Sequence, residues 1–200
     1  MQSSTKKMGE GYLMTSKKYD DLLYRGCLLD LQMKEGSGVK TQDWAKPHHK
    51  TRLINTPTWT DIDGLNLIEL DGALEFIQSY SGDTADLDFV ADDFGIMSFV
   101  YFDAIGSRES ILTRGQEDVD GYAVYKDAND AIVFETYQAG ATQITKTGNS
   151  AVSAITWYHI MITRSGASVR IYINGVDKTS TVGTHINPTT ATRELKIGRA

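Results

Sequence analysis

The sequence from residue 157 to residue 176 reads WYHIMITRSGASVRIYINGV, and this stretch decides the fold. Two runs rich in aromatic and β-branched residues flank the short connection Ser165–Ser168, a pattern typical of a β-hairpin. Every second residue of Val169–Ile173 is apolar, so this run should cover a core with one face. Both positions of Asn174-Gly175 accept positive φ, which predicts a type I′ turn and a further short strand from Val176.

This hairpin resembles the signature hairpin of the laminin G-like, concanavalin A-like jelly rolls. Other segments resemble parts of the same family in the same order: Leu29–Gly38, His48–Leu53, Leu70–Phe76, Phe94–Val100 followed by Ile111–Gly115, and Leu195–Arg199. The resemblance covers roughly residues 27–200. It implies an all-β, antiparallel jelly-roll β-sandwich, with residues 26–200 as the domain and residues 1–25 as a polar N-terminal arm. Because this fold hosts lectins, adhesion modules, glycosidases and virion proteins, the resemblance alone does not decide the function.

Composition narrows the class of protein. Hydrophobic residues make up 40% of the 200-residue chain, enough for one packed core. A formal net charge of −6 without a basic patch argues against a nucleic-acid partner. Cys27 is the only cysteine, so no intrachain disulfide can form, and we interpret it as a buried core thiol.

The targeting signals of the chain are equally sparse. No stretch approaches the length of a membrane span, and Met1–Glu10 lacks the apolar core of a signal peptide. Relatives of this fold are often secreted. We therefore expect either a segment of something larger or a protein released by cell lysis, as a virus particle is, that acts on a virion or extracellular surface.

Alternating and apolar runs predict further strands. The first sandwich strand is expected at Cys27–Met33 and a central strand at Gly95–Phe102. A hairpin is expected about Asp71-Gly72, between Asn66–Leu70 and Ala73–Ile77. The later strands are predicted at Ile111–Thr113, Gly121–Lys126, Ala131–Tyr137, Thr142–Lys146 and Glu194–Ile197.

The sequence lacks the carboxylate pattern of the glycosidases that share this fold. Glycosidases of this fold carry Glu-x-Asp-x-Glu on one strand face, which sets the carboxyl groups at acid/base distance. Glu69–Asp71 lacks the third carboxylate, because position 73 is Ala73, and Glu117–Asp120 has the wrong spacing. We therefore predict that the protein is not an enzyme.

Metal binding is the alternative interpretation of one acidic segment. Its five carboxylates are those of Asp83, Asp86, Asp88, Asp92 and Asp93. Calcium takes several hard oxygen ligands, but the spacing does not follow the Asp-x-Asp-x-Asp-Gly loop. We interpret the segment as a solvated acidic loop, predict no cofactor, and keep calcium as the alternative. Neighbouring side chains of His48-His49 point to opposite sides of an extended chain, so a shared metal is not expected there either.

A polar, tyrosine-containing cluster is the candidate ligand-binding patch, expected at a rim of the sandwich. Planar amide, guanidinium and carboxylate groups beside tyrosine rings suit hydroxyl-rich ligands. The residues are Arg114, Gln116, Asp118, Asp120, Tyr122 and Tyr125.

We therefore predict a non-catalytic attachment module on a virion or cell surface that binds a glycan or a neighbouring coat protein. The alternatives are a purely structural capsid or fibre subunit and the sugar-binding domain of a secreted glycosidase. In the family, the Leu-x-Ile-Gly strand is followed by one more strand beside the first; here the sequence stops at Arg199-Ala200, directly after Ile197-Gly198. We therefore expect a vacant edge along Cys27–Met33, filled either by the segment around Tyr12–Met14 or by a strand of a neighbouring subunit, which would give a homo-oligomer.

Overall fold

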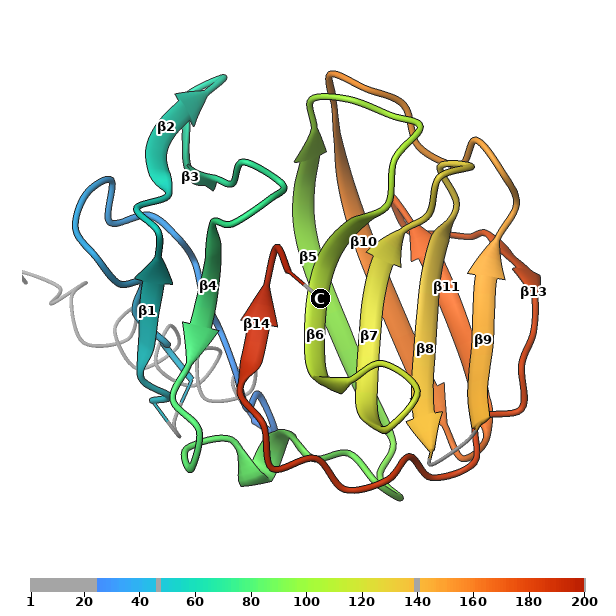
Figure 1. Ribbon diagram of the computed structural model, residues 1–200. Coiled ribbons are helices and arrows are strands. Elements are labelled where there is room, and N and C mark those ends of the chain that lie inside the picture. Colours follow the sequence, from blue (N-terminus) through green and yellow to red (C-terminus); the bar gives the residue numbers. More distant parts are fainter. Residues whose placement is uncertain (1–24, 46–47, 139–140, 200) are drawn as a thin grey trace, which may run out of the picture.

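A computed structural model describes residues 25–45, 48–138 and 141–199, and confirms the all-β sandwich (Figure 1). The large sheet has eight strands in the order β1-β4-β14-β6-β7-β8-β9-β13, and the small sheet four in the order β12-β11-β10-β5. A separate ribbon pairs β2 with β3. The strands are β1 (Thr51–Ile54), β2 (Thr58–Ile62), β3 (Leu65–Glu69), β4 (Phe76–Ser79), β5 (Phe94–Phe102), β6 (Glu109–Gln116), β7 (Asp120–Lys126), β8 (Ile132–Gln138), β9 (Ala141–Thr147), β10 (Thr156–Ser165), β11 (Ser168–Ile173), β12 (Val176–Asp177), β13 (Thr179–Thr181) and β14 (Leu195–Ile197).

The small sheet contains the hairpin that the sequence predicts. β10 and β11 pair antiparallel from Ile160↔Ile173 to Ser165↔Ser168. The turn after β11 has φ of 51° at Asn174 and 79° at Gly175, which confirms positive φ at both central positions. β12 folds back as predicted, and β5 pairs with the other side of β10.

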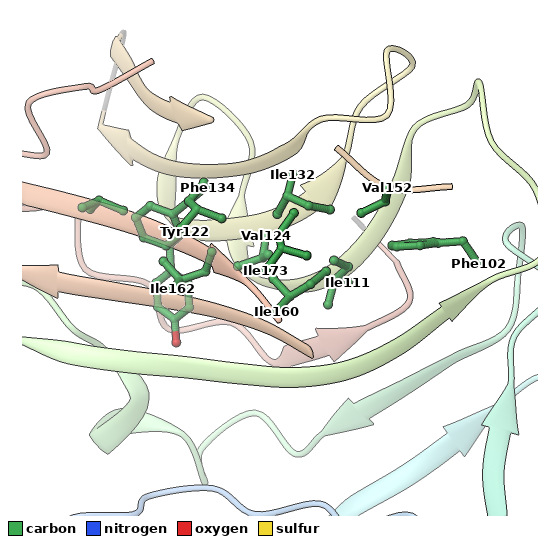
Figure 2. Close-up of a cluster of buried hydrophobic side chains, with 12 residues drawn as sticks. Phe102, Ile111, Tyr122, Val124, Ile132, Phe134, Val152, Ile160, Ile162 and Ile173 are labelled. Atoms are coloured by element: carbon green, nitrogen blue, oxygen red, sulfur yellow. The ribbon is translucent and has the colours of Figure 1, made fainter. Parts of the chain in front are cut away.

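The core lies between the two sheets (Figure 2). Ile160 and Ile162 of β10 and Ile171 of β11 meet Val124 of β7 and Phe134 of β8. Each of these side chains is almost fully buried. Full burial of one aliphatic or aromatic side chain is worth about 1.5–3 kcal/mol, so this cluster contributes a large share of the stability.

Two predicted elements are wrong. Cys27–Met33 forms no strand; within the described residues its only ladder contact is the isolated bridge between Leu31 and Asp43. The predicted hairpin about Asp71-Gly72 lies one turn earlier, where β2 and β3 pair around Asp63-Gly64. Oδ1 of Asp71 accepts hydrogen bonds from the backbone N–H groups of Ala73, Leu74 and Glu75, which makes a wider turn. β4 follows this turn and joins the large sheet.

The open edge is not where the sequence placed it. β14 lies inside the large sheet between β4 and β6, whereas β5 is the edge of the small sheet. The segment around Tyr12–Met14 lies outside the described residues, as does nearly all of the proposed arm. Among the described residues, no helix has the length and apolar character needed to cross a membrane.

Candidate functional site

The outer face of the large sheet carries a buried polar group on β7 and β8. Alternate residues of a strand point to opposite faces, so Tyr122 and Phe134 pack into the core while Tyr125, Glu135 and Tyr137 point away from it. The hydroxyl of Tyr125 donates to Glu135 Oε1 at 2.5 Å, and that of Tyr137 donates to Oε2 at 2.8 Å. Both carboxylate oxygens are therefore occupied, which offsets the cost of burying the charge.

The two tyrosines keep their protons over the whole physiological range. Burial raises the pKa of Tyr125, and its hydrogen bond to Glu135 raises it further. The pKa of Tyr137 is raised by burial and by the nearby Glu135 charge. This face therefore holds two neutral tyrosines and one carboxylate whose oxygens are both engaged, all three nearly buried.

Arg108 covers the ring of Tyr125 at the rim. Its guanidinium carbon lies 4.1 Å from the ring centroid, and Nη1 donates to Glu117 Oε1 at 3.0 Å. Burial lowers the pKa of Arg108, but the Glu117 carboxylate outweighs it and the pKa is raised overall. Because this ion pair is partly exposed, it is worth at most about 1 kcal/mol, and its main effect is to position the arginine plane.

A pocket of about 310 Å³ opens beside this group. That volume lies at the lower end of the range of about 300–1,000 Å³ for small-molecule sites. The pocket combines an aromatic ring with amide, hydroxyl, cationic and carboxylate groups. Its lining residues are Thr113, Gly115, Gln116, Glu117, Tyr137, Arg193, Glu194 and Lys196.

The structure brings part of the predicted patch to this pocket. Gln116 lines it, and Asp120 Oδ1 accepts the N–H of Gln116 at 2.8 Å. Asp120 Oδ2 lies 3.6 Å from Arg193 Nε, so it holds one pocket wall. Tyr125 lies on the same outer face, and Asp118, in the turn between β6 and β7, accepts a hydrogen bond from the hydroxyl of Thr142.

Arg114 and Tyr122 are not part of this surface. Both are almost fully buried, and they are directly paired across β6 and β7. Arg114 Nη1 donates to Asp88 Oδ1 at 3.0 Å and Nη2 to the carbonyl of Thr84 at 2.8 Å. Tyr122 donates to the carbonyl of Leu87 at 2.9 Å. The patch predicted from sequence is thus divided between the two faces of the large sheet.

Several side chains of this face and pocket, among them those of Glu135, Tyr137, Arg193 and Lys196, were missed by sequence reasoning. Glu135 and Tyr137 stand two apart on β8, and this period-two spacing of polar groups could have indicated a shared face. Arg193 and Lys196 reach the pocket only because β14 pairs with β6, where Lys196 faces Thr113. No local pattern in the sequence predicts that β14 pairs with β6.

The five aspartates of the acidic segment bind separate partners. The backbone N–H of Lys50 donates to Asp83, and Asp88 pairs with Arg114. The N–H of Gly166 donates to Asp93, while the carbonyl of Asp92 accepts from Arg164. Within the part of the chain that the structure describes, no three histidine, cysteine or carboxylate groups gather to hold a metal.

The fifth aspartate, Asp86, forms an ion pair with a buried histidine. His49 Nε2 lies 2.9 Å from Asp86 Oδ1, and His49 Nδ1 lies 2.8 Å from Asp43 Oδ2. Burial lowers the pKa of His49, but the two carboxylates outweigh it and raise the pKa overall. The imidazole therefore ties the segment before β1 to the acidic loop, which is a structural role.

The chain also matches a known family. Residues 78–200 match the family model described as the concanavalin A-like lectin/glucanases superfamily. The chain belongs to this superfamily. No match was found among curated proteins. As a concanavalin A-like domain, it places its candidate pocket on the outer face of one sheet, away from the core.

Solved structures share the fold at low identity. The binding domain of Paraclostridial Mosquitocidal Protein 1 matches with a TM-score of 0.68 and 13% identity, over 86% of this chain and 44% of that one. The binding domain of botulinum neurotoxin DC in complex with SialylT gives 0.64 and 13%, over 88% and 44%. The same domain in complex with rat synaptotagmin II gives 0.62 and 14%, over 86% and 43%. The chain spans less than half the length of these proteins, and the likeness establishes the fold alone.

Proposed function

We propose that this domain is a non-catalytic attachment module that binds a glycan in the pocket on the outer face of the large sheet. The observation that carries the proposal is the pocket, where Tyr137 lies beside Gln116 and Arg193. Sugars present hydroxyl groups that donate and accept hydrogen bonds, together with apolar ring faces. Amide, cationic and carboxylate groups beside an aromatic ring suit both features.

The carboxylates of this face support binding without hydrolysis. Glycoside cleavage uses two carboxyl groups about 5 to 9.5 Å apart on either side of the bond. Here both oxygens of Glu135 accept tyrosine hydroxyls, and Glu117 is engaged by Arg108. Asp120 is engaged by Gln116 and Arg193. Glu194, which also lines the pocket, is the carboxylate to test. We expect no release of reducing sugar from a panel of glucans; release that Glu194→Gln abolishes would contradict a pure binding role.

The setting that we propose is a virion or cell surface, where the partner is a glycan or a neighbouring coat protein. The shared fold includes a binding domain in complex with SialylT and one in complex with rat synaptotagmin II, which supports both kinds of partner. A purely structural coat or fibre subunit is the alternative, favoured by the open edge of β5.

A glycan array tests the proposal with a matched pair of variants. Arg193 and Arg170 have nearly equal side-chain exposure, 48% and 49%, and each has an aspartate at 3.6 Å and 3.8 Å respectively. Only Arg193 lines the pocket. We expect Arg193→Ala to weaken binding at least about tenfold, the usual cost of losing one charge-assisted contact, and Arg170→Ala to bind like the parent.

Two outcomes of the array would contradict this assignment. If the parent protein binds no glycan on a broad array, the result favours the alternative of a purely structural coat or fibre subunit. If both arginine variants bind like the parent, or lose binding equally, the ligand sits elsewhere on the domain.

A further inference from the structure

β5 is a long strand with one open side. Its nine residues form an edge of the small sheet, and no described strand pairs with the side that faces away from β10. The carbonyl of Phe102 accepts the N–H of Ile155 on the side of β10. Since the backbone groups of successive residues point to opposite sides of an antiparallel strand, alternate residues of β5 direct theirs outward. These are Gly95, Met97, Phe99 and Tyr101.

This edge lacks the features that normally prevent strand pairing. Natural edge strands are kept apart by charged side chains, prolines, bulges or short length. The sequence of β5, FGIMSFVYF, has no charge and no proline, and its register with β10 is unbroken over all nine residues. The strand is therefore a ready template for another strand.

The other edges of the two sheets are protected. β12 has two residues and includes Asp177, and β1 has four and includes the exposed Arg52. β13 has three residues, and its register with β9 shifts within them. Among the four edges of the described sandwich, only β5 is both long and unprotected.

Apolar side chains of β5 are also left uncovered. On the outer face Met97 is 67% and Phe99 58% exposed. On the core side Ile96 and Val100 are only half-buried, whereas Ile160 on the adjacent β10 is 1% exposed. The core therefore thins at β5, and one more strand beside it would bury apolar surface on both faces.

We propose that a second copy of this chain pairs with β5 through its own β5, in antiparallel orientation, so that the two small sheets join. The strand complements itself in this arrangement. Pairing about Ser98 sets Met97 of one copy opposite Phe99 of the other, and methionine sulfur packs well against aromatic rings. On the core side the same register sets Ile96 opposite Val100.

Electrostatics make this pairing dependent on salt. The nine paired residues are uncharged, but the register about Ser98 places Asp93 near Asp103 of the second copy at each end. The net charge of −6 on each copy adds a general repulsion. Association should therefore strengthen as ionic strength rises, because salt screens these like charges.

Sedimentation equilibrium of the full chain over a range of concentrations tests the proposal. Met97 and Met161 face each other on adjacent strands, and their side chains share the outer face of the small sheet. Only Met97 lies on the edge. Because lysine on an edge strand opposes pairing, Met97→Lys should raise the dimer dissociation constant at least about tenfold, and Met161→Lys less than about threefold.

Hydrogen exchange supplies the second measurement. The amides of Met97 and Phe99 should exchange slowly at concentrations where the dimer forms and rapidly where it dissociates. A monomer at all concentrations overturns the proposal, as does equal weakening by both lysine variants, which would assign the contact to the sheet face. Slow exchange in a monomer that is lost on deletion of residues 1–20 also overturns it, since the chain then covers its own edge.

Discussion

His185 is a fully buried histidine that titrates far below its usual range. Its Nδ1 lies 2.9 Å from the hydroxyl of Thr136, and its Nε2 lies 2.8 Å from that of Thr145. Burial lowers its pKa from 6.5 to about 4, and the charge of Arg164 acts in the same direction. The ring is therefore neutral in the native state, with one nitrogen donating and the other accepting.

This histidine makes stability depend on pH. The unfolded chain binds a proton near pH 6.5, whereas the native state resists it down to about pH 4. The stability that the neutral ring contributes is thus complete above pH 6.5 and is lost as the pH falls towards 4. Urea unfolding of the parent and of His185→Gln over this interval should show a smaller pH slope for the variant. Parallel slopes would exclude His185 as the responsible group.

Gly121, beside the pocket, lies very close to the backbone of the adjacent strand β6. Its φ is 79°, and a Cβ there would lie 1.9 Å from the carbonyl oxygen of Arg114. Gly121→Ala should cost about 3 kcal/mol or more, since it adds a clash to the backbone strain. Gly106 has a φ of 85° but nothing near its Cβ position, so Gly106→Ala should cost only about 1 kcal/mol. Equal losses of unfolding free energy in the two variants would show that the clash relaxes.

At the scale of elements, the turn between β11 and β12 depends on positive φ at both of its central residues. Gly175 lies at φ of 79° in a two-residue turn. A β-branched side chain is strained at positive φ, so Gly175→Val should cost about 1 to 3 kcal/mol. Thermal unfolding measures this loss, and a variant that melts like the parent would mean that the turn adopts another geometry.

Strands that cover a core with one face could be predicted from sequence, because their apolar residues recur at every second position. Val169–Ile173 and Gly95–Phe102 were placed within one residue of β11 and β5. Alternation does not reveal which strand lies alongside, and Cys27–Met33 therefore alternates without joining a ladder. Two Asp-Gly pairs, Asp63-Gly64 and Asp71-Gly72, could each form the tight turn of a hairpin. The hairpin forms at the first pair, because the side chain of Asp71 accepts backbone N–H groups and makes a wider turn at the second.

The candidate site was only half predictable for the same reason. Gln116 and Asp120 lie beside one another across the β6–β7 turn, so local sequence brings them together. Arg114 was misplaced because a shift of one residue along a strand sends a side chain to the other face. Arg193 and Lys196 depend on the entry of β14 between β4 and β6, which only the assembled sheet shows.

At the scale of the whole molecule, the sandwich should hold without metal or disulfide. Cys27 is a free thiol, and the carboxylates of Asp83, Asp86, Asp88 and Asp93 bind separate protein groups. Melting temperatures measured with and without a chelator, and with and without a reductant, should agree. A marked fall in chelator would make the segment from Asp83 to Asp93 a calcium site.

The pocket and the open edge of β5 lie on different sides of the sandwich, and this separation has a consequence for avidity. Directly opposite residues of an antiparallel pair place their side chains on the same face, so two copies joined through β5 keep both large sheets on one side. Both pockets would then face the same ligand-bearing surface. Binding of the second site becomes intramolecular, which can strengthen attachment by about 10²–10⁴ without any new contact. Such a pair would distinguish surfaces by the density and spacing of a ligand as well as by its chemistry. Met97→Lys would weaken that discrimination while leaving each single pocket intact.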